Sequence, residues 1–209
     1  MRLMTLGIVV IIFLDACATV SMQGRIENGR YFAPNGKIVF TAQKGGPQYT
    51  RRDIYVASID RGFFEETDTF GLRGMYYTSL ASLGVSPPSN TDERRSALNK
   101  GLIDFATPNI FLPASPDAEV VHQEFVVEQG KEMLLALARL PGLSGAFDLR
   151  TNKKFDAYPA ILVLVEHGYV IVLRVQSNMT DAETSDPQEK ASHYLGALRR
   201  LKSGLEVRQ

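Results

Sequence analysis

Few residues in this chain of 209 have the types and the sequence spacing that catalysis by a nucleophilic side chain requires. Ser144 lies in Gly-Leu-Ser-Gly-Ala, which approaches the Gly-x-Ser-x-Gly pattern of a nucleophile elbow, but Ala146 stands where the second glycine belongs. Such a serine also needs a histidine base and an acid beside it. No sequence feature places either group near Ser144. A hydrolase that uses Ser144 with one of the histidines is therefore an alternative, and a loop is the preferred interpretation.

The residues that could bind metal ions are also dispersed. The three histidines, His122, His167 and His193, show no His-x-x-x-His spacing, and one cysteine cannot form a zinc site with several thiolates. Acidic residues gather in the segment 179–189, where a calcium loop is conceivable because calcium binds clustered oxygen atoms; they are Asp181, Glu183, Asp186 and Glu189. This segment lacks the spacing and the glycine of an EF-hand. We therefore predict no metal, no cofactor and no catalytic centre.

The single cysteine, Cys17, follows an apolar segment at the start of the chain. Arg2 precedes the uncharged run Leu6 to Leu14, whose length is typical of an export signal and well short of the roughly 20 residues that cross a membrane. A buried strand is the alternative, but a strand would not naturally begin behind a lone arginine and end at Asp15. We expect residues 1–16 to be a signal peptide.

The segment Leu14-Asp15-Ala16-Cys17 resembles the lipobox of bacterial lipoproteins, in which an aliphatic residue and small residues precede a cysteine. The resemblance implies that the thiol of Cys17 is alkylated with diacylglycerol, that the chain is cut just before it, and that acyl chains hold the domain on a membrane. Asp15 departs from the family, which usually has Ser, Ala, Thr or Val there. Ala18 is not the aspartate of an inner-membrane retention signal, so the resemblance favours the outer membrane of a Gram-negative host.

A second cleavage pattern overlaps the first. Ala16-Cys17-Ala18 fits the A-x-A site of an ordinary secretory signal, and cutting there would discard the cysteine and release the domain. The position of the only cysteine at the end of an apolar run favours lipidation over this alternative.

The chain has no net charge and therefore lacks the basic excess that nucleic-acid-binding proteins commonly carry. Lys plus Arg is 23 and Asp plus Glu is 23, so the net charge is zero and nucleic acid is not an expected partner. No polybasic patch is evident that would assist a lipid anchor. We expect the acyl chains to supply the membrane attachment and another envelope protein to be the partner.

One domain is predicted to follow a short tether. Residues 17–29 are polar and indicate a lipidated N-terminus with a flexible tether, and residues 30–209 indicate the domain. Pro34-Asn35-Gly36 predicts a hairpin turn. Further strands are expected over 53–60, 70–80, 121–127, 133–140, 160–165 and 169–175. Periodicity alone would also allow a helix over 133–140, but its short length and its place between a turn and Pro141-Gly142 favour a strand. In the strand 121–127 we expect Phe125 and Val127 to face the core and His122 to face outward, and 166–168 to be a tight turn.

Two helices are predicted. The first is expected to begin after Ser89 as its N-cap and to stop at Pro108, with Leu98, Leu102 and Phe105 on one face. The second begins with Asp186 as the cap and Pro187 in the first turn, and ends at Gly204. Its apolar stripe comprises Ala191, Tyr194, Leu195, Leu198 and Leu201.

These elements predict an α+β domain, with a mostly antiparallel sheet packed against a mid-chain helix and a C-terminal helix. The element order resembles the PsbP/Mog1-like fold, which implies a role in binding and assembly. We therefore expect an exported, membrane-tethered binding or assembly module of the cell envelope. A carrier of a small apolar ligand between sheet and helix is a further alternative. The aromatic residues Phe63, Phe64, Phe70, Tyr76 and Tyr77 are expected to pack in the core.

Overall fold

The computed structural model describes residues 24–41, 50–54, 60–68, 71–142, 156–177 and 186–209. The N-terminal segment with Cys17 lies outside these ranges, as do Phe70, Ser144, Asp181 and Glu183. What we expect of these residues stays a prediction.

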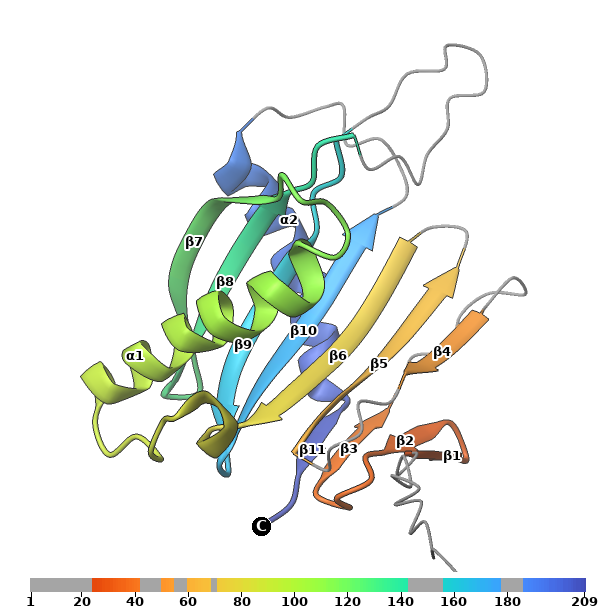
Figure 1. The fold of residues 1–209 in the computed structure, drawn as a ribbon, viewed down its shortest axis with the longest axis vertical. Coiled ribbons are helices and arrows are strands. Elements are labelled where there is room, and N and C mark those ends of the chain that lie inside the picture. Colours follow the sequence, from red (N-terminus) through yellow and green to blue (C-terminus); the bar gives the residue numbers. More distant parts are fainter. Residues whose placement is uncertain (1–23, 42–49, 55–59, 69–70, 143–155, 178–185) are drawn as a thin grey trace, which may run out of the picture.

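A seven-stranded antiparallel sheet forms the centre of the molecule (Figure 1). Its spatial order is β4-β5-β6-β10-β9-β8-β7. The strands are β4 (Thr50–Ile54), β5 (Arg61–Asp68), β6 (Gly71–Ser79), β7 (Glu119–Glu128), β8 (Lys131–Arg139), β9 (Ala160–Glu166) and β10 (Tyr169–Ser177). The predicted strands over 70–80, 133–140, 160–165 and 169–175 are confirmed as β6, β8, β9 and β10. Strands β8 to β10 are buried on both faces, which explains their continuous apolar sequences.

Two-residue turns join the strands of this meander. Gln129 and Gly130 link β7 to β8 with φ values of 51° and 74°, and His167 and Gly168 link β9 to β10 with 46° and 82°. Both residues of each turn adopt the left-handed conformation that matches the twist of a hairpin. The predicted tight turn at 166–168 is confirmed.

One strand of the large sheet was not predicted, and another only in part. The expected strand over 53–60 corresponds to β4 at Asp53 and Ile54, and residues 55–59 lie outside the described part of the chain. Strand β5 went unidentified because Glu65, a charged residue in its centre, is buried and breaks the expected apolar pattern.

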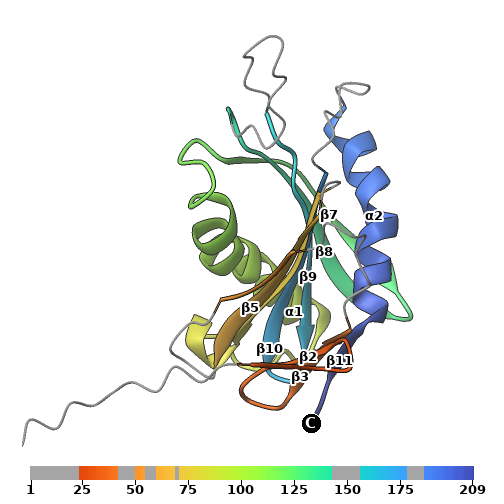
Figure 2. The same ribbon diagram turned by 90° about the vertical axis from the view of Figure 1, so that its right-hand side faces the viewer.

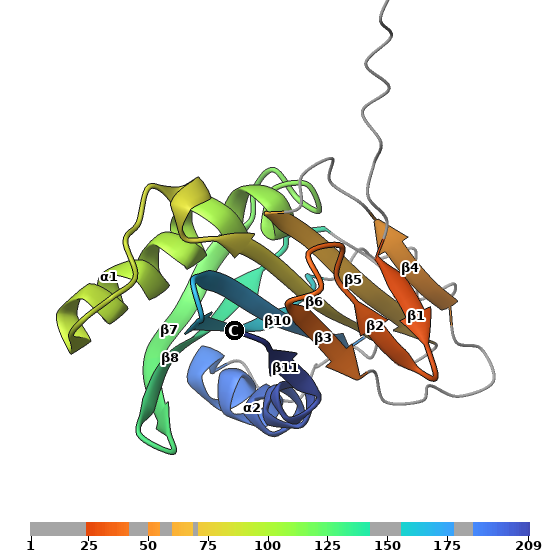
Figure 3. The ribbon, with the colours of Figure 1, turned by 90° about the horizontal axis from the view of Figure 1, so that it is seen from below.

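A second, four-stranded sheet packs beside the first, in the order β1-β2-β3-β11 (Figure 3). Its strands are β1 (Arg25–Glu27), β2 (Arg30–Phe32), β3 (Ile38–Thr41) and β11 (Leu205–Val207). The predicted hairpin at Pro34-Asn35-Gly36 is confirmed between β2 and β3. The predicted tether is too long, because the domain already begins at β1. Asn28 and Gly29, at φ values of 50° and 78°, form the turn that pairs β1 with β2.

The mid-chain helix continues past its predicted end. It consists of α1 (Thr91–Lys100) and, without a break, the π-helical segment η2 (Gly101–Phe111), and a short 3-10 helix, η1 (Ala81–Leu83), precedes it. The N-cap is Asn90, whose side chain accepts from the Glu93 amide at 2.9 Å, rather than the predicted Ser89. Ser89 instead donates to the Glu93 carboxylate through its amide and hydroxyl, at 2.8 and 2.9 Å.

Pro108 therefore does not stop this helix. In η2 the Leu112 amide donates to the Thr107 carbonyl, five residues back, which is the wider π-helical pattern. Proline supplies no amide proton, and side chains satisfy neighbouring carbonyls. Thr107 Oγ1 donates to the Leu102 carbonyl at 2.9 Å, and Asn109 Nδ2 donates to the Phe105 carbonyl at 2.7 Å.

The C-terminal helix α2 (Pro187–Ser203) begins and ends as predicted. The Asp186 side chain accepts from the Gln188 amide at 2.9 Å, and Gly204 is the C-cap. The chain then adds β11 to the small sheet, which the sequence analysis did not predict. None of the helices in the described ranges has both the length and the apolar character needed to span a membrane.

The helices cover opposite faces of the large sheet, which confirms the predicted α+β architecture (Figure 2). Helix α1 with η2 packs on one face through Leu98, Leu102 and Phe105, and α2 packs on the other through the predicted stripe. Both layers are filled with buried apolar side chains. Among the aromatic residues predicted to pack in the core, Phe64, Tyr76 and Tyr77 are buried, and Phe63 is partly buried against Tyr76.

The predicted facing of β7 is wrong. A β-bulge between Val120 and His122 shifts the register, so Phe125 and Val127 lie on the α1 side of the sheet and His122 on the α2 side. Phe125 is 36% exposed and Val127 64% exposed, whereas the His122 side chain is 18% exposed. One extra residue in a strand moves every following side chain to the opposite face of the sheet. A bulge of this kind leaves no clear pattern in a single sequence.

Candidate partner-binding surface

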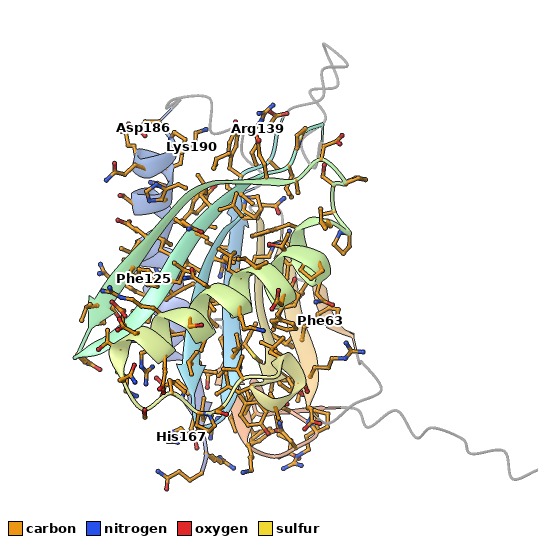
Figure 4. All side chains as sticks on the ribbon, turned by 60° about the vertical axis from the view of Figure 1, so that its left-hand side comes forward. Phe63, Phe125, Arg139, His167, Asp186 and Lys190 are labelled. Carbon is orange, nitrogen blue, oxygen red and sulfur yellow. The ribbon has the colours of Figure 1, made fainter. Side chains whose placement is uncertain are left out.

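The residue types that could do chemistry do not converge in the described part of the chain. His122 lies on β7, His167 occupies the β9–β10 turn, and His193 is exposed on α2. Across the described ranges, no three His, Cys, Asp or Glu side chains are grouped as metal ligands. Of the acidic cluster, Asp186 caps α2 (Figure 4), and Glu189 lies in the first turn of this helix. These positions add no support for a metal-dependent activity.

A buried charged cluster on the α1 side of the large sheet is the main polar feature that the sequence analysis missed. Arg174 of β10 and Glu65 of β5 form an ion pair whose side chains are 8% and 11% exposed. The Tyr76 hydroxyl donates to Glu65, and Arg174 donates to the Tyr76 oxygen at 3.2 Å and to Gln176 Oε1 at 2.7 Å. Arg174 within the otherwise apolar run YVIVLRV was the signal that could have revealed it.

This charged cluster has the properties of a structural network. Burial lowers the pKa of Arg174, and the neighbouring Glu65 carboxylate opposes that shift. Arg174 Nε is buried and lacks a hydrogen-bond partner among the described residues. The charged and polar groups of the cluster are shielded from solvent and bonded to one another, which is the arrangement of a structural ion pair.

The exposed apolar side chains point to a different region. Large apolar residues of the described chain that remain exposed are Ile26, Ile103, Leu112, Val120, Phe125 and Val127. Three of the six lie on β7, which is an edge strand of the large sheet. We define the β7 surface as Val120, Phe125 and Val127 together with Arg95 of α1.

The placement of the helix explains why the β7 surface is open. Helix α1 packs on β8 and β9 and leaves the α1 side of the edge strand partly uncovered. A long side chain bridges the gap, because the Arg95 guanidinium lies 5.1 Å from the centre of the Phe125 ring. Figure 4 shows Phe125 on β7 on one side of the helix and Phe63 on the other.

Arg95 is held in this position by a carboxylate. Its Nε and Nη2 donate to Glu132 of β8, with distances of 2.7 to 3.0 Å. The hydrogen bonds between Arg95 and Glu132 favour the charged form of both groups. They lower the pKa of Glu132 and raise the pKa of Arg95. The Arg95 side chain nevertheless remains 48% exposed. A fixed arginine stacked on an accessible phenylalanine is typical of the anchor residues in protein interfaces.

The ends of β7 are fastened by ion pairs. At its start, Glu119 accepts from Arg139 Nη1 at 2.7 Å, and Arg139 Nε also donates to Asp156 at 2.8 Å. At its end, Glu128 accepts from Arg199 and from Lys202 Nζ, the latter at 2.9 Å. The edge strand is thereby fixed to α2 and to the segment before β9. A partner would meet a largely pre-formed surface.

No family model matches the chain, and no curated protein matches it. Among solved structures, the solution structure of cyanobacterial PsbP (CyanoP) from Synechocystis sp. PCC 6803 is similar, with a TM-score of 0.48 and 15% sequence identity. The match covers 93% of this chain and 98% of that chain. It supports a weak PsbP-like likeness of fold, and a likeness of this size carries no argument about function.

Proposed function

We propose that this protein is an exported lipoprotein whose single domain, tethered to a membrane of the cell envelope through Cys17, binds another envelope protein through the β7 surface. The observation that carries the binding role is the exposed edge strand, where Phe125 and Val127 are accessible beside a fixed Arg95. The lipobox-like residues Leu14, Ala16 and Cys17 support the tether.

The edge position suggests how the partner binds. Within the described part of the chain, β7 pairs with β8 on one side and has no strand on the other. An edge strand offers a row of backbone donors and acceptors to an extended segment, and alternate side chains supply specificity. The partner on this proposal contributes such a segment, with apolar residues that pack on Phe125 and Val127.

Two measurements test the two parts of this proposal. In a bacterial host, the mature wild-type chain should have the mass of residues 17–209 plus acyl groups, and Cys17→Ala should lack them. A mature mass without acyl groups, for a chain starting beyond Cys17, would refute the tether.

The second measurement addresses the β7 surface in the envelope itself. A photo-reactive phenylalanine analogue at position 125 should cross-link a specific envelope protein, while the same analogue at the exposed His193 on α2 should not. Equal cross-linking from both positions, or none from position 125, would refute the role of the β7 surface.

A further inference from the structure

A group of cations lies on the outer face of the small sheet, although the sequence contains no basic run there. The guanidinium carbons of Arg25, Arg30 and Arg208 lie 4.9, 5.5 and 5.9 Å from the centre of the Phe32 ring. Lys37 is exposed beside them, and its carbonyl accepts from the Arg208 amide at 2.8 Å. We call Arg25, Arg30, Phe32, Lys37 and Arg208 the basic face.

Strand alternation turns these residues away from the core. Arg25 pairs with Phe32 between β1 and β2, so both point to the same side of the sheet. Their neighbours Tyr31 and Phe40 point to the other side, where both are buried and lie close to Phe64 of β5. The side chains of Arg25, Arg30 and Arg208 are 64%, 39% and 45% exposed.

Two carboxylates neutralise only part of this charge. Glu27 pairs with Arg25 at 2.8 Å, and Glu206 pairs with both Arg30 and Arg208. Four cations against two carboxylates leave the basic face with two surplus positive charges. An aromatic ring surrounded by guanidinium groups suits the boundary between water and lipid headgroups, where both groups find partners.

The start of the chain brings this face near the membrane. Six residues separate Cys17 from Gly24, and an extended chain spans at most about 3.6 Å per residue, so a lipid on Cys17 lies within about 25 Å of Gly24. Gly24 immediately precedes β1. This step rests on the proposed tether.

We propose that the basic face docks on anionic phospholipid headgroups and thereby orients the tethered domain. The small sheet packs against β5, and the β7 surface lies five strand spacings away across the large sheet. At about 4.8 Å per spacing, the β7 surface lies roughly 24 Å from β5 across the large sheet, to one side of the small sheet (Figure 3), so a membrane docked on the basic face leaves it uncovered.

The chain contains no tryptophan, which permits a direct test. Phe32→Trp places one tryptophan in the basic face. Phe125→Trp is the matched control, because Phe125 is also partly exposed and also lies beneath an arginine. Each full-length variant, purified from the bacterial host, is mixed with vesicles of phosphatidylcholine and brominated phosphatidylglycerol, and flotation reports vesicle association separately from quenching.

We expect bromine to quench the tryptophan fluorescence of Phe32→Trp and to leave that of Phe125→Trp unchanged. The quenching should be weaker when salt is added. It should also be weaker with vesicles made of brominated phosphatidylcholine alone, which carry no net charge. Arg25→Gln with Arg30→Gln should lower the docking equilibrium constant by about 25-fold, since each cation near an anionic surface contributes about fivefold. The same loss from Lys100→Gln with Arg200→Gln, two exposed cations on the helices, would contradict a specific face.

The outcomes separate this inference from the proposed tether. A Phe32→Trp protein that floats with the vesicles while its fluorescence stays unquenched overturns the docking and leaves the tether intact. A Phe32→Trp chain that carries no lipid but shows salt-sensitive quenching refutes the tether and retains the docking. An unlipidated chain with no quenching at low salt overturns both.

Discussion

Arg174 of β10 and Glu65 of β5 meet across Gly74 of the strand between them, with Arg174 Nη1 3.4 Å from Glu65 Oε1. Gly74 is the cross-strand partner of both residues, and it has no side chain to separate them. A Cβ at Gly74 would lie 3.1 Å from the Tyr76 ring and 3.3 Å from Glu65 Cγ. Glycine at position 74 therefore lets the ion pair join β5 and β10 across β6.

Removing one partner of this pair should be far more damaging than removing both. In Glu65→Leu the buried Arg174 charge loses its counter-ion, and we expect the free energy of unfolding to fall by about 3–5 kcal/mol. The double variant Glu65→Leu/Arg174→Met exchanges the ion pair for apolar groups and should recover most of that loss. Urea unfolding of the three proteins measures this, and a double variant as unstable as Glu65→Leu would contradict it.

Two helical glycines should respond oppositely to alanine. At Gly101, where α1 meets η2, a Cβ would lie 2.7 Å from Val170 Cγ1 and 2.9 Å from Val163 Cγ1. Gly101→Ala should therefore destabilise the fold by about 1–3 kcal/mol, although alanine is the better helix former. Gly196→Ala on α2 is the control, because within the described part of the chain the nearest atom to its Cβ outside the helix backbone would be Arg200 Nη1, at 3.8 Å.

Gly196→Ala should raise the free energy of unfolding by about 0.5–1 kcal/mol, the intrinsic helix preference of alanine. Thermal or urea unfolding of both variants gives the comparison. Stabilisation by both substitutions would show that the helix can move away from β9 and β10.

The packing role of Gly101 could not be predicted from the sequence. Inside a helix this glycine looks unfavourable, and its role emerges only from Val163 and Val170, which lie far along the chain. The central strands and α2 were predictable because their apolar periodicity and capping residues are local signals. The α1–η2 helix runs through Pro108, and beside it the side chains of Thr107 and Asn109 donate to the Leu102 and Phe105 carbonyls, which no helix propensity describes.

The candidate surfaces were harder to predict than the fold. The bulge near Val121 reversed the facing of Phe125, so the residue expected in the core became the centre of the β7 surface. The basic face draws Arg25 and Arg208 from opposite ends of the described chain, and only the pairing of β11 with β3 brings them together. Long-range strand pairing leaves no signature in the local sequence.

The link between β7 and α2 should depend on pH. Hydrogen bonds and charge from Lys202 and Arg199 lower the pKa of Glu128 from its ordinary value of 4.5. A carboxylate with a lower pKa in the folded chain stabilises the fold fully above 4.5, and this contribution disappears as the pH falls through the folded-state pKa. Glu128→Gln should therefore be less stable than wild type at neutral pH, and the difference should vanish in acid.

Urea unfolding of wild type and Glu128→Gln across this pH range provides the measurement. The same difference at every pH would mean that Glu128 stabilises the fold by packing instead of by charge.

The β7 surface should be dispensable for folding and essential for partner binding. Val127 is 64% exposed, so Val127→Ser should change the free energy of unfolding by about 1 kcal/mol or less. Phe125 is 36% exposed, so Phe125→Ser should lower it by about 1–2 kcal/mol. In the envelope, each variant should lower the recovery of the cross-linked or co-purified partner by at least about fivefold, since anchor residues commonly contribute more than about 1 kcal/mol to binding. The core substitution Leu135→Ala should do the reverse and destabilise the fold by about 2–5 kcal/mol, because Leu135 is fully buried. Quantitative pull-down beside urea unfolding separates the two effects, and full partner recovery with Phe125→Ser would exclude the edge strand as the binding site.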